Sequence, residues 1–338
     1  MSSAWARGHA LTGLDPLGQE NVGNSVLKVD PESAYALLAP GVSYFDFHAC
    51  LVRHNLRDQV WGDVPDVGGS SVIGNMLERG AGYTPYGDHC GQEQAAHEQE
   101  PNESRQLFDY GLGPQSGILS ESPLGIIVRM GIWLMPNPGG YQAYMITFPR
   151  DNDLDQIFAA LQPPHQIHKY TDSNKLLTDL KLDEIAQNLT VGRWNLYRAM
   201  YGSPIIRDAL YAKFYFPEDR PNDIALQTRS DTMQRTPFTT ELGLLSWLPN
   251  SGHLFFSPIT KITGPDAKAQ DDITRRLIEE YGFDFIGKDP DSRRRAYELI
   301  QVLTAEAADR GWGEYRAHLV LIDQIAEIYS FNGNAQMK

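Results

Sequence analysis

The residues best suited to chemistry gather in one stretch, 63–89, which reads DVPDVGGSSVIGNMLERGAGYTPYGDH. The pair Gly68–Gly69 opens a tight loop, since glycine allows positive φ and the close approach of a ligand to the backbone. Ser70 or Ser71 can then cap a short helix predicted over 72–79. A glycine loop that leads into a helix N-terminus offers N–H groups and a positive dipole end to a phosphate. A plain turn that caps a helix is the alternative.

The other familiar sources of chemistry are missing from the sequence. It has no Ser-His-Asp order, no Walker loop, no GxGxxG and no cluster of side chains with metal-ligand spacing. Cys50 and Cys90 are too few for a disulfide scaffold and do not have metal-ligand spacing. We therefore expect no metal site and look to an organic cofactor, for which a protein supplies orientation and electrostatics.

Two further stretches agree with the first. Residues 120–140 read SESPLGIIVRMGIWLMPNPGG, an apolar strand-like run closed by Pro-Asn-Pro-Gly-Gly, and residues 311–318 read GWGEYRAH. In this order the three stretches resemble the FAD-linked oxidases of the vanillyl-alcohol oxidase family, which includes eugenol oxidase and 4-cresol dehydrogenase. The resemblance covers most of the chain from Val26 onward.

The resemblance implies an α+β fold with a partial PCMH-type FAD-binding domain and a cap domain, in which helices flank a large antiparallel sheet. It places an irregular N-terminus at 1–25, the FAD-binding domain at 26–140, the cap or substrate domain at 141–311, and a truncated return to the FAD domain at 312–338. The alternation of strands and helices after residue 141 also favours an antiparallel sheet with helices on one face.

The activity implied by the resemblance is that of an FAD-dependent oxidoreductase acting on CH–OH groups of aromatic alcohols and on para-substituted phenols. Hydride would pass from the benzylic carbon to the flavin, water would trap the resulting quinone methide, and O₂ would be the electron acceptor. Asp66 matches an aspartate beside the reactive face of the flavin, and Tyr315 and Arg316 match a pair that binds the phenolate oxygen. A guanidinium and a phenol O–H suit an oxyanion. The alternatives are an Asx-turn at Asp66 and a surface pair at 315–316.

The cofactor contacts implied by the resemblance lie in the first turn, the glycine loop, the tyrosine loop and the apolar run. They are Pro40, Gly41, Val42, Ser43, Pro65, Gly68, Gly69, Ser70, Tyr83, Gly125, Ile126, Ile127 and Val128. Tyr86, Asp88 and His89 match the same loop near the flavin, with structural hydrogen bonding as the alternative.

The chain also departs from the family. The upstream pyrophosphate loop is not matched in residues 1–25, and an acidic stretch, 91–106, stands where strands are expected. No histidine follows the DFIG of 284–287 before Trp312, so FAD is expected to be bound without a covalent link. The pattern resembles a truncated or internally deleted member. An FAD-linked oxidase of a non-phenolic alcohol and a non-catalytic remnant unable to hold FAD remain the other functions.

The composition limits the class of protein and its partners. The 338 residues are 41% hydrophobic and 21% charged, as in an ordinary globular protein long enough for two domains. The net charge of −14 and a pI near 5.0 argue against nucleic-acid and anionic-membrane partners. Without a secretory or peroxisomal signal in the sequence, a cytoplasmic location is the expectation, with a phenolic small molecule and O₂ as reactants and a homo-oligomer left open.

Local patterns predict the elements. Ser43 should cap a helix, with Asp46 at the capping-box position. Tyr44, Phe47, Leu51 and His54 lie on one face of this helix at helical spacing, and His48 and His54 are expected at the helix surface rather than as ligands. Strands are predicted over 33–38, 141–148, 193–201, 213–216 and 283–286, and around a turn in 246–258. Helices are predicted from Asp151 or Asn152, over 182–189, 204–212 and 266–281, from a Ser292 cap to 308, and over 320–329.

Overall fold

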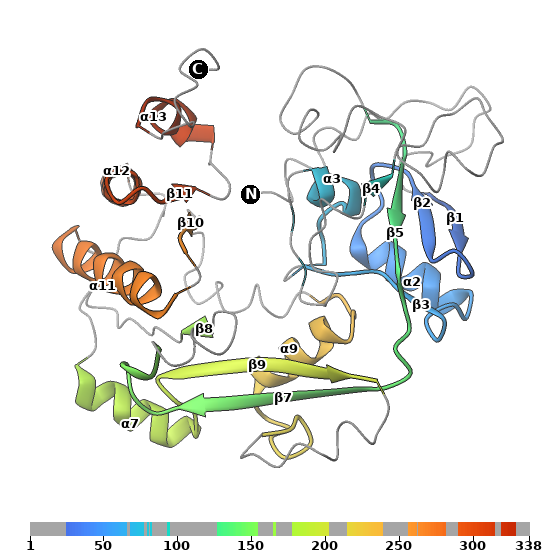
Figure 1. The fold of residues 1–338 in the computed structure, drawn as a ribbon, viewed down its shortest axis with the longest axis horizontal. Helices are drawn as coiled ribbons and strands as arrows, with labels where there is room; N and C mark the ends of the chain where they lie inside the picture. Colours follow the sequence, from blue (N-terminus) through green and yellow to red (C-terminus); the bar gives the residue numbers. More distant parts are fainter. Residues whose placement is uncertain are drawn as a thin grey trace. The chain divides into compact units, whose positions relative to one another are not determined.

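The structure is a computed structural model that describes residues 25–65, 68–77, 80, 82, 93–94, 127–154, 165–166, 178–202, 215–238, 256–261, 263–281, 290–314 and 319–328 (Figure 1). The chain divides into two compact units, Met1–Tyr144 with Arg198–Leu245, and Met145–Tyr197 with Ser246–Lys338. The domain limits that the sequence predicts at residues 140 and 311 stay predictions.

The first unit is built on an antiparallel sheet in the order β1-β2-β5-β4. Its strands are β1 (Val26–Asp30), β2 (Tyr35–Leu38), β4 (Glu93–Gln94) and β5 (Met130–Trp133). The strand predicted over 33–38 is β2, whereas β1 has no counterpart among the predicted strands. Leu38 at the end of β2 pairs with Met130 at the start of β5, so the chain leaves β2 and enters β5 at the same end of the sheet.

Helix α2 (Tyr44–Arg53) has the predicted capping box. The Ser43 side chain accepts a hydrogen bond from the Asp46 backbone N–H at 3.1 Å, and the Asp46 carboxylate accepts one from the Ser43 N–H at 3.0 Å. Tyr44, Phe47 and Leu51 are buried as expected. His54 is the exposed C-cap of this helix, which agrees with its expected place at the helix surface.

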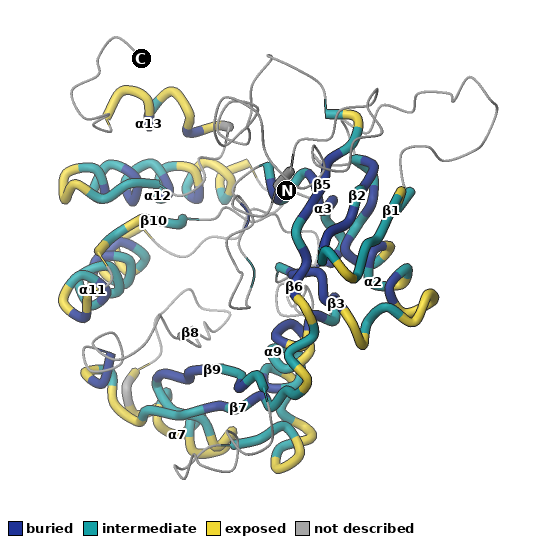
Figure 2. Tube along the Cα trace, turned by 45° about the vertical axis from the view of Figure 1, so that its right-hand side comes forward, coloured by how far each residue is buried: buried dark blue, intermediate teal, exposed yellow. Residues whose placement is uncertain are grey.

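The core of the first unit lies between this sheet and two helices, α2 and the short α3 (Val72–Leu77). Its buried members come from β2, α2, α3 and β5 and from the turn after β2, and they include Leu38, Val42, Phe47, Val72 and Ile132. Figure 2 shows this burial as dark blue along β2 and β5. A two-stranded sheet, β3 (Val60–Trp61) with β6 (Met135–Pro136), extends the unit.

A second sheet has the order β7-β9-β8, from β7 (Tyr141–Phe148), β9 (Trp194–Tyr201) and β8 (His165–Gln166). The strands predicted over 141–148 and 193–201 are therefore confirmed. Helix α7 (Asp179–Leu189) starts three residues before the predicted 182, and α9 (Ile224–Met233) was not predicted. The helix predicted over 204–212 and residues 213–214 of the strand predicted over 213–216 lie outside the described residues.

Besides α7, the second unit contains the helices α11 (Gly264–Tyr281), α12 (Pro290–Asp309) and α13 (Ile322–Ile328). The last of these follows a 3₁₀ turn, η3 (Leu319–Leu321). These three helices pack through one apolar cluster that includes Leu277, Ile300, Leu303, Leu321 and Ile325. Ser292 is not the N-cap of α12 as predicted, because the helix already begins at Pro290, a residue suited to a first turn. The strand predicted over 283–286 lies outside the described residues.

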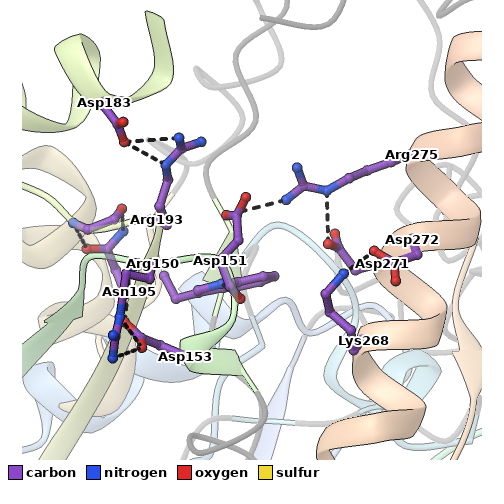
Figure 3. A network of polar contacts seen from close by, with 12 residues as sticks. Arg150, Asp151, Asp153, Asp183, Arg193, Asn195, Lys268, Asp271, Asp272 and Arg275 are labelled. Carbon is purple, nitrogen blue, oxygen red and sulfur yellow. Dashed lines mark hydrogen bonds and ion pairs between the residues drawn. The ribbon is translucent and has the colours of Figure 1, made fainter. Parts of the chain in front are cut away.

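A polar network ties the turn at 150–154 to its surroundings in the second unit (Figure 3). Arg150 pairs with Asp153 at 2.9 Å, and Arg275 of α11 pairs with Asp271 at 2.9 Å and reaches Asp151 at 3.9 Å. Of the helix predicted to start at Asp151 or Asn152, only residues 151–154 are described. The turn is thereby held to α11 by charge as well as by the packing of Leu154 against Ala267.

Candidate functional site

Two of the predicted cofactor segments share one end of the first sheet. Pro40–Ser43 follow β2, and Ile127 and Val128 precede β5, where Leu38 and Met130 are paired. Ile127 packs against the core, whereas Val128 is 60% exposed to solvent. The antiparallel register therefore brings together residues that are more than eighty positions apart in the chain.

The glycine loop lies against the same turn. Ser43 and Ser71 form an isolated antiparallel bridge. The Val72 N–H donates to the Val42 carbonyl at 3.0 Å, and the Tyr44 N–H donates to the Ser70 carbonyl at 3.3 Å. Helices α2 and α3 consequently begin side by side, and the Pro40–Ser43 turn and the loop that ends at Ser71 form one backbone surface.

Ser71 is the residue that caps α3. Its hydroxyl accepts a hydrogen bond from the Gly74 N–H at 3.1 Å and donates one to the Pro40 carbonyl at 2.5 Å. The sequence left Ser70 and Ser71 as alternatives, and the capping contact belongs to Ser71. One side chain thus starts the helix and also fixes the first turn to the glycine loop.

The two glycines of the loop have different surroundings. A Cβ at Gly68 would lie 2.4 Å from the Pro237 Cβ and 3.1 Å from the Phe45 ring, so the absence of a side chain is required by close packing. Among the described residues, a Cβ at Gly69 would meet only the Phe45 ring, at 3.8 Å, an ordinary van der Waals contact. Within that part of the chain Gly69 is thus less tightly enclosed than Gly68.

Asp63 and Arg235 are the charged residues near this loop that sequence reasoning missed. Both are buried, and the Arg235 Nη1 lies 3.5 Å from the Asp63 Oδ1. No local pattern could have joined them, since they are distant in sequence and each is flanked by loop residues. Pro65, a predicted cofactor contact, is half-buried two residues after Asp63.

The second unit fixes the strand that leads into the predicted phenolate pair. β11 (Gly313–Glu314) pairs with β10 (Pro258–Ile259), and the Glu314 Oε1 accepts a hydrogen bond from the Ser257 N–H at 3.0 Å. Burial raises the pKa of the Glu314 carboxyl, and the Ser257 N–H opposes that shift. Residues 315 and 316 therefore follow directly from an anchored strand.

Several predicted site residues lie outside the described residues: Asp66, Tyr83, Tyr86, Asp88, His89, Gly125, Ile126, Tyr315 and Arg316. Within the described part of the chain, no group of three or more His, Cys, Asp or Glu side chains could hold a metal ion. No helix in that part is both long and apolar enough to cross a membrane.

Solved structures with a similar fold indicate the class of protein to which the chain is related. An α+β chain with these antiparallel sheets matches the PCMH-type flavoprotein oxidases, which confirms the predicted fold class. The 4-ethylphenol oxidase from Gulosibacter chungangensis, solved as its isoeugenol complex, matches with a TM-score of 0.81 and 27% identity, over 93% of this chain and 74% of its own. p-Cresol methylhydroxylase, solved with substrate bound, matches with a TM-score of 0.81 and 23% identity, over 91% and 73%.

Sequence comparison agrees. The flavoprotein subunit of 4-cresol dehydrogenase from Pseudomonas putida is 25% identical over 375 residues, which cover 90% of this chain and 72% of the relative. The resemblance to the vanillyl-alcohol oxidase family is thereby confirmed, and the chain is a homologue of these flavoproteins. No family model matches the chain. The matched stretch of 375 residues exceeds the 338 of this chain, so the relative has residues within it that this chain lacks.

Proposed function

We propose that the protein is an FAD-dependent oxidase of para-substituted phenols, with O₂ as the electron acceptor. The observation that carries the proposal is the single backbone surface formed by Pro40–Ser43 and Gly68–Ser71 beside Ile127 and Val128. Three segments expected from the resemblance to contact FAD meet there. Relatives named for 4-cresol and 4-ethylphenol, matched over 90% and 93% of the chain, support the substrate class.

The residues around this surface suit the nucleotide part of FAD. Backbone groups of Gly41 and Gly69 can approach a ligand closely, because neither carries a side chain. The hydroxyls of Ser43 and Ser71 are engaged in capping, so they set the shape of the surface. FAD, when bound, would supply the hydride acceptor. Since no histidine lies between Phe285 and Trp312, the cofactor would be held without a covalent link.

Two parts of the chain are proposed to act on the substrate. Asp66 would balance charge beside the flavin and assist the attacking water. Tyr315 and Arg316 would bind the substrate oxygen as phenolate, which increases the electron-donating power of the ring. Glu314 supports this second role, because its hydrogen bond to Ser257 anchors the strand that ends immediately before the pair.

The electron acceptor is the step on which the relatives differ. The Gulosibacter chungangensis protein is named an oxidase, and the Pseudomonas putida protein is named the flavoprotein subunit of a dehydrogenase. We favour O₂ because the oxidase is the more similar of the two solved structures in sequence, at 27% against 23% identity. Reduced protein mixed with aerated buffer should regain its oxidised spectrum at a rate that increases with O₂ concentration. Reoxidation only by an added dye would favour a dehydrogenase.

The absorbance spectrum of the purified protein tests the proposal. We expect flavin bands from bound FAD, which acid precipitation should release into the supernatant. Fluorescence that stays on the denatured polypeptide would overturn the non-covalent assignment. A protein that stays colourless after addition of FAD would instead support the remnant.

The substrate class needs its own measurement. Titration with a 4-alkylphenol such as 4-ethylphenol should perturb the flavin spectrum and reduce the flavin when oxygen is excluded. A matched non-phenolic alcohol, 4-methoxybenzyl alcohol, should reduce it far more slowly, because it cannot form a phenolate. Equal rates with both compounds would favour the oxidase of a non-phenolic alcohol.

A further inference from the structure

A buried ion pair joins the segment before the glycine loop to the end of α9. The side chains of Arg235 and Asp63 are 1% and 0% exposed, and the Arg235 Nη1 lies 3.5 Å from the Asp63 Oδ1. The Arg235 Nη2 also donates to the Met135 Sδ at 3.0 Å. Arg235 follows the C-cap of α9 with φ of +62°, a conformation that usually selects glycine. The side chain is therefore kept at a position where the backbone disfavours it.

Asp63 contacts a third segment. Its Oδ1 accepts a hydrogen bond from the Val64 N–H at 3.0 Å. A Cβ built at Gly82 would lie 2.1 Å from the Asp63 Oδ2, so the Gly82 backbone rests directly against the carboxylate. In the sequence Asp66 comes three residues after Asp63, and Tyr83 follows Gly82. The Asp63 carboxylate thus contacts residues that lie shortly before Asp66 and Tyr83 in the sequence.

The segment after α9 is docked along the same region by further contacts. The Arg57 Nη2 donates to the Gln234 carbonyl and to the Thr236 hydroxyl, each at 2.8 Å. The Gly68 N–H donates to the Phe238 carbonyl at 3.4 Å. Residues 234–238 therefore run beside 57–68, and the Arg235 side chain enters the interior between them.

We infer that Asp63, held by Arg235, is a positioning residue that fixes the two flavin loops and the 234–238 segment in register. The inference rests on the proposed function for its consequence, which is the correct placement of Asp66 and Tyr83. Stability alone does not account for such a pair. Removing two charges from water costs several kcal/mol each, and a buried ion pair can be replaced by apolar side chains without loss of stability.

A positioning role and a purely stabilising role predict different results for two variants of this pair. Asp63→Asn keeps the shape of the side chain and removes the carboxylate charge that faces the buried Arg235 guanidinium. The double variant Asp63→Leu/Arg235→Met removes both charges. The control is Asp223→Asn, because Asp223 pairs with Arg220 at 3.1 Å in the same unit and caps α9 through the Leu226 N–H at 3.0 Å. Asparagine caps helices as well as aspartate does.

The first readout is hydrogen exchange in the apo-protein. With Asp63→Asn we expect amides of 62–69, of Gly82 and of 234–238 to exchange faster together by about tenfold, which is the effect of 1.4 kcal/mol on a local opening equilibrium. Asp223→Asn should leave these three segments at the wild-type rate. Unchanged exchange in all three segments with Asp63→Asn would overturn the inference.

The second readout is bound FAD. Asp63→Asn should change the visible circular dichroism of the flavin and slow its reduction by 4-ethylphenol by about a hundredfold, the penalty typical of a reacting group misplaced by 1 Å. The double variant should recover most of the melting temperature and keep both flavin defects. Recovery of flavin signal and rate together with stability would assign the pair a purely structural role and overturn the inference. A wild-type protein that binds no FAD would overturn the proposed function. Hydrogen exchange in the apo-protein would still show whether Asp63 holds the three segments in place.

Discussion

Ser43 and Ser71 lie opposite each other in an antiparallel bridge, and each is the cap of the helix that follows it. The pairing places the N-termini of α2 and α3 side by side. It also joins the turn after β2 to the glycine loop. Replacement of either capping serine should therefore disturb the backbone of both segments.

Ser71→Ala should destabilise the protein by about 1–2 kcal/mol, because it removes the cap of α3 and leaves the Pro40 carbonyl without its donor. Thr178→Ala is a matched control, since Thr178 is the N-cap of α7 but makes no side-chain capping hydrogen bond. Urea unfolding of both variants measures the difference. Equal losses of unfolding free energy in the two variants would show that the hydrogen bonds of the Ser71 hydroxyl do not stabilise the protein.

Gly68→Ala should lower stability by about 1–3 kcal/mol, because the added methyl group would overlap Pro237 and press on the Phe45 ring. Gly69→Ala should change the free energy of unfolding by less than about 0.5 kcal/mol, since its methyl group meets only an ordinary contact. Thermal unfolding of the apo-proteins distinguishes them. If the loop receives FAD at Gly69, that variant should nevertheless bind FAD more weakly, which equilibrium titration would measure.

The contrast between Ser43 and Arg235 shows how far the sequence could predict this structure. The capping box at Ser43 is local, because all its atoms lie within four residues, so the pattern S-x-x-D was enough to start α2 correctly. The same holds for the period-2 strand over 141–148. Arg235 reaches Asp63 through tertiary packing, and its left-handed backbone contradicts the local preference. Such positions escape pattern reasoning because distant contacts decide them.

The candidate site divides in the same way. The resemblance indicated Pro40–Ser43, Gly68–Ser70 and Gly125–Val128 as separate segments. The register of β2 with β5 shows that the first segment and the described residues of the last, Ile127 and Val128, lie at the same end of the sheet. The helix α9 was missed because its apolar residues do not form one stripe along the sequence: Leu226, Thr232 and Met233 are the buried ones. Its Asp223 cap was the signal available.

Glu314→Gln should alter the pH dependence of stability. Burial raises the pKa of the Glu314 carboxyl above its ordinary value of 4.5, so the folded state binds this proton more tightly than the unfolded state. Stability from this group is therefore present below pH 4.5 and is lost as pH rises through the raised pKa. The glutamine variant can still accept the Ser257 N–H and has no carboxyl to ionise.

The difference in unfolding free energy between Glu314→Gln and wild type should consequently shift in favour of the variant as pH rises from 4.5, and then level off. Urea unfolding of both proteins across this range gives the curve. Glu184→Gln is the control, since its partner Lys181 is 51% exposed and an exposed ion pair contributes little. A difference that stays constant with pH would contradict the burial of the Glu314 carboxylate.

Arg316 provides the test of substrate chemistry. If the substrate is bound as phenolate, Arg316→Ala leaves its oxygen without a cation, and a loss of a few kcal/mol corresponds to about a hundredfold or more in rate. Arg316→Lys keeps the charge but loses the planar fork, so an intermediate rate is expected. Arg310→Ala is the control: this arginine pairs with Glu306 at 3.0 Å and lies over the Trp312 ring. Stopped-flow reduction of the flavin by 4-ethylphenol measures all three variants. Reduction of Arg316→Ala at the wild-type rate would remove this residue from phenolate binding, and with it most of the case for a phenol substrate.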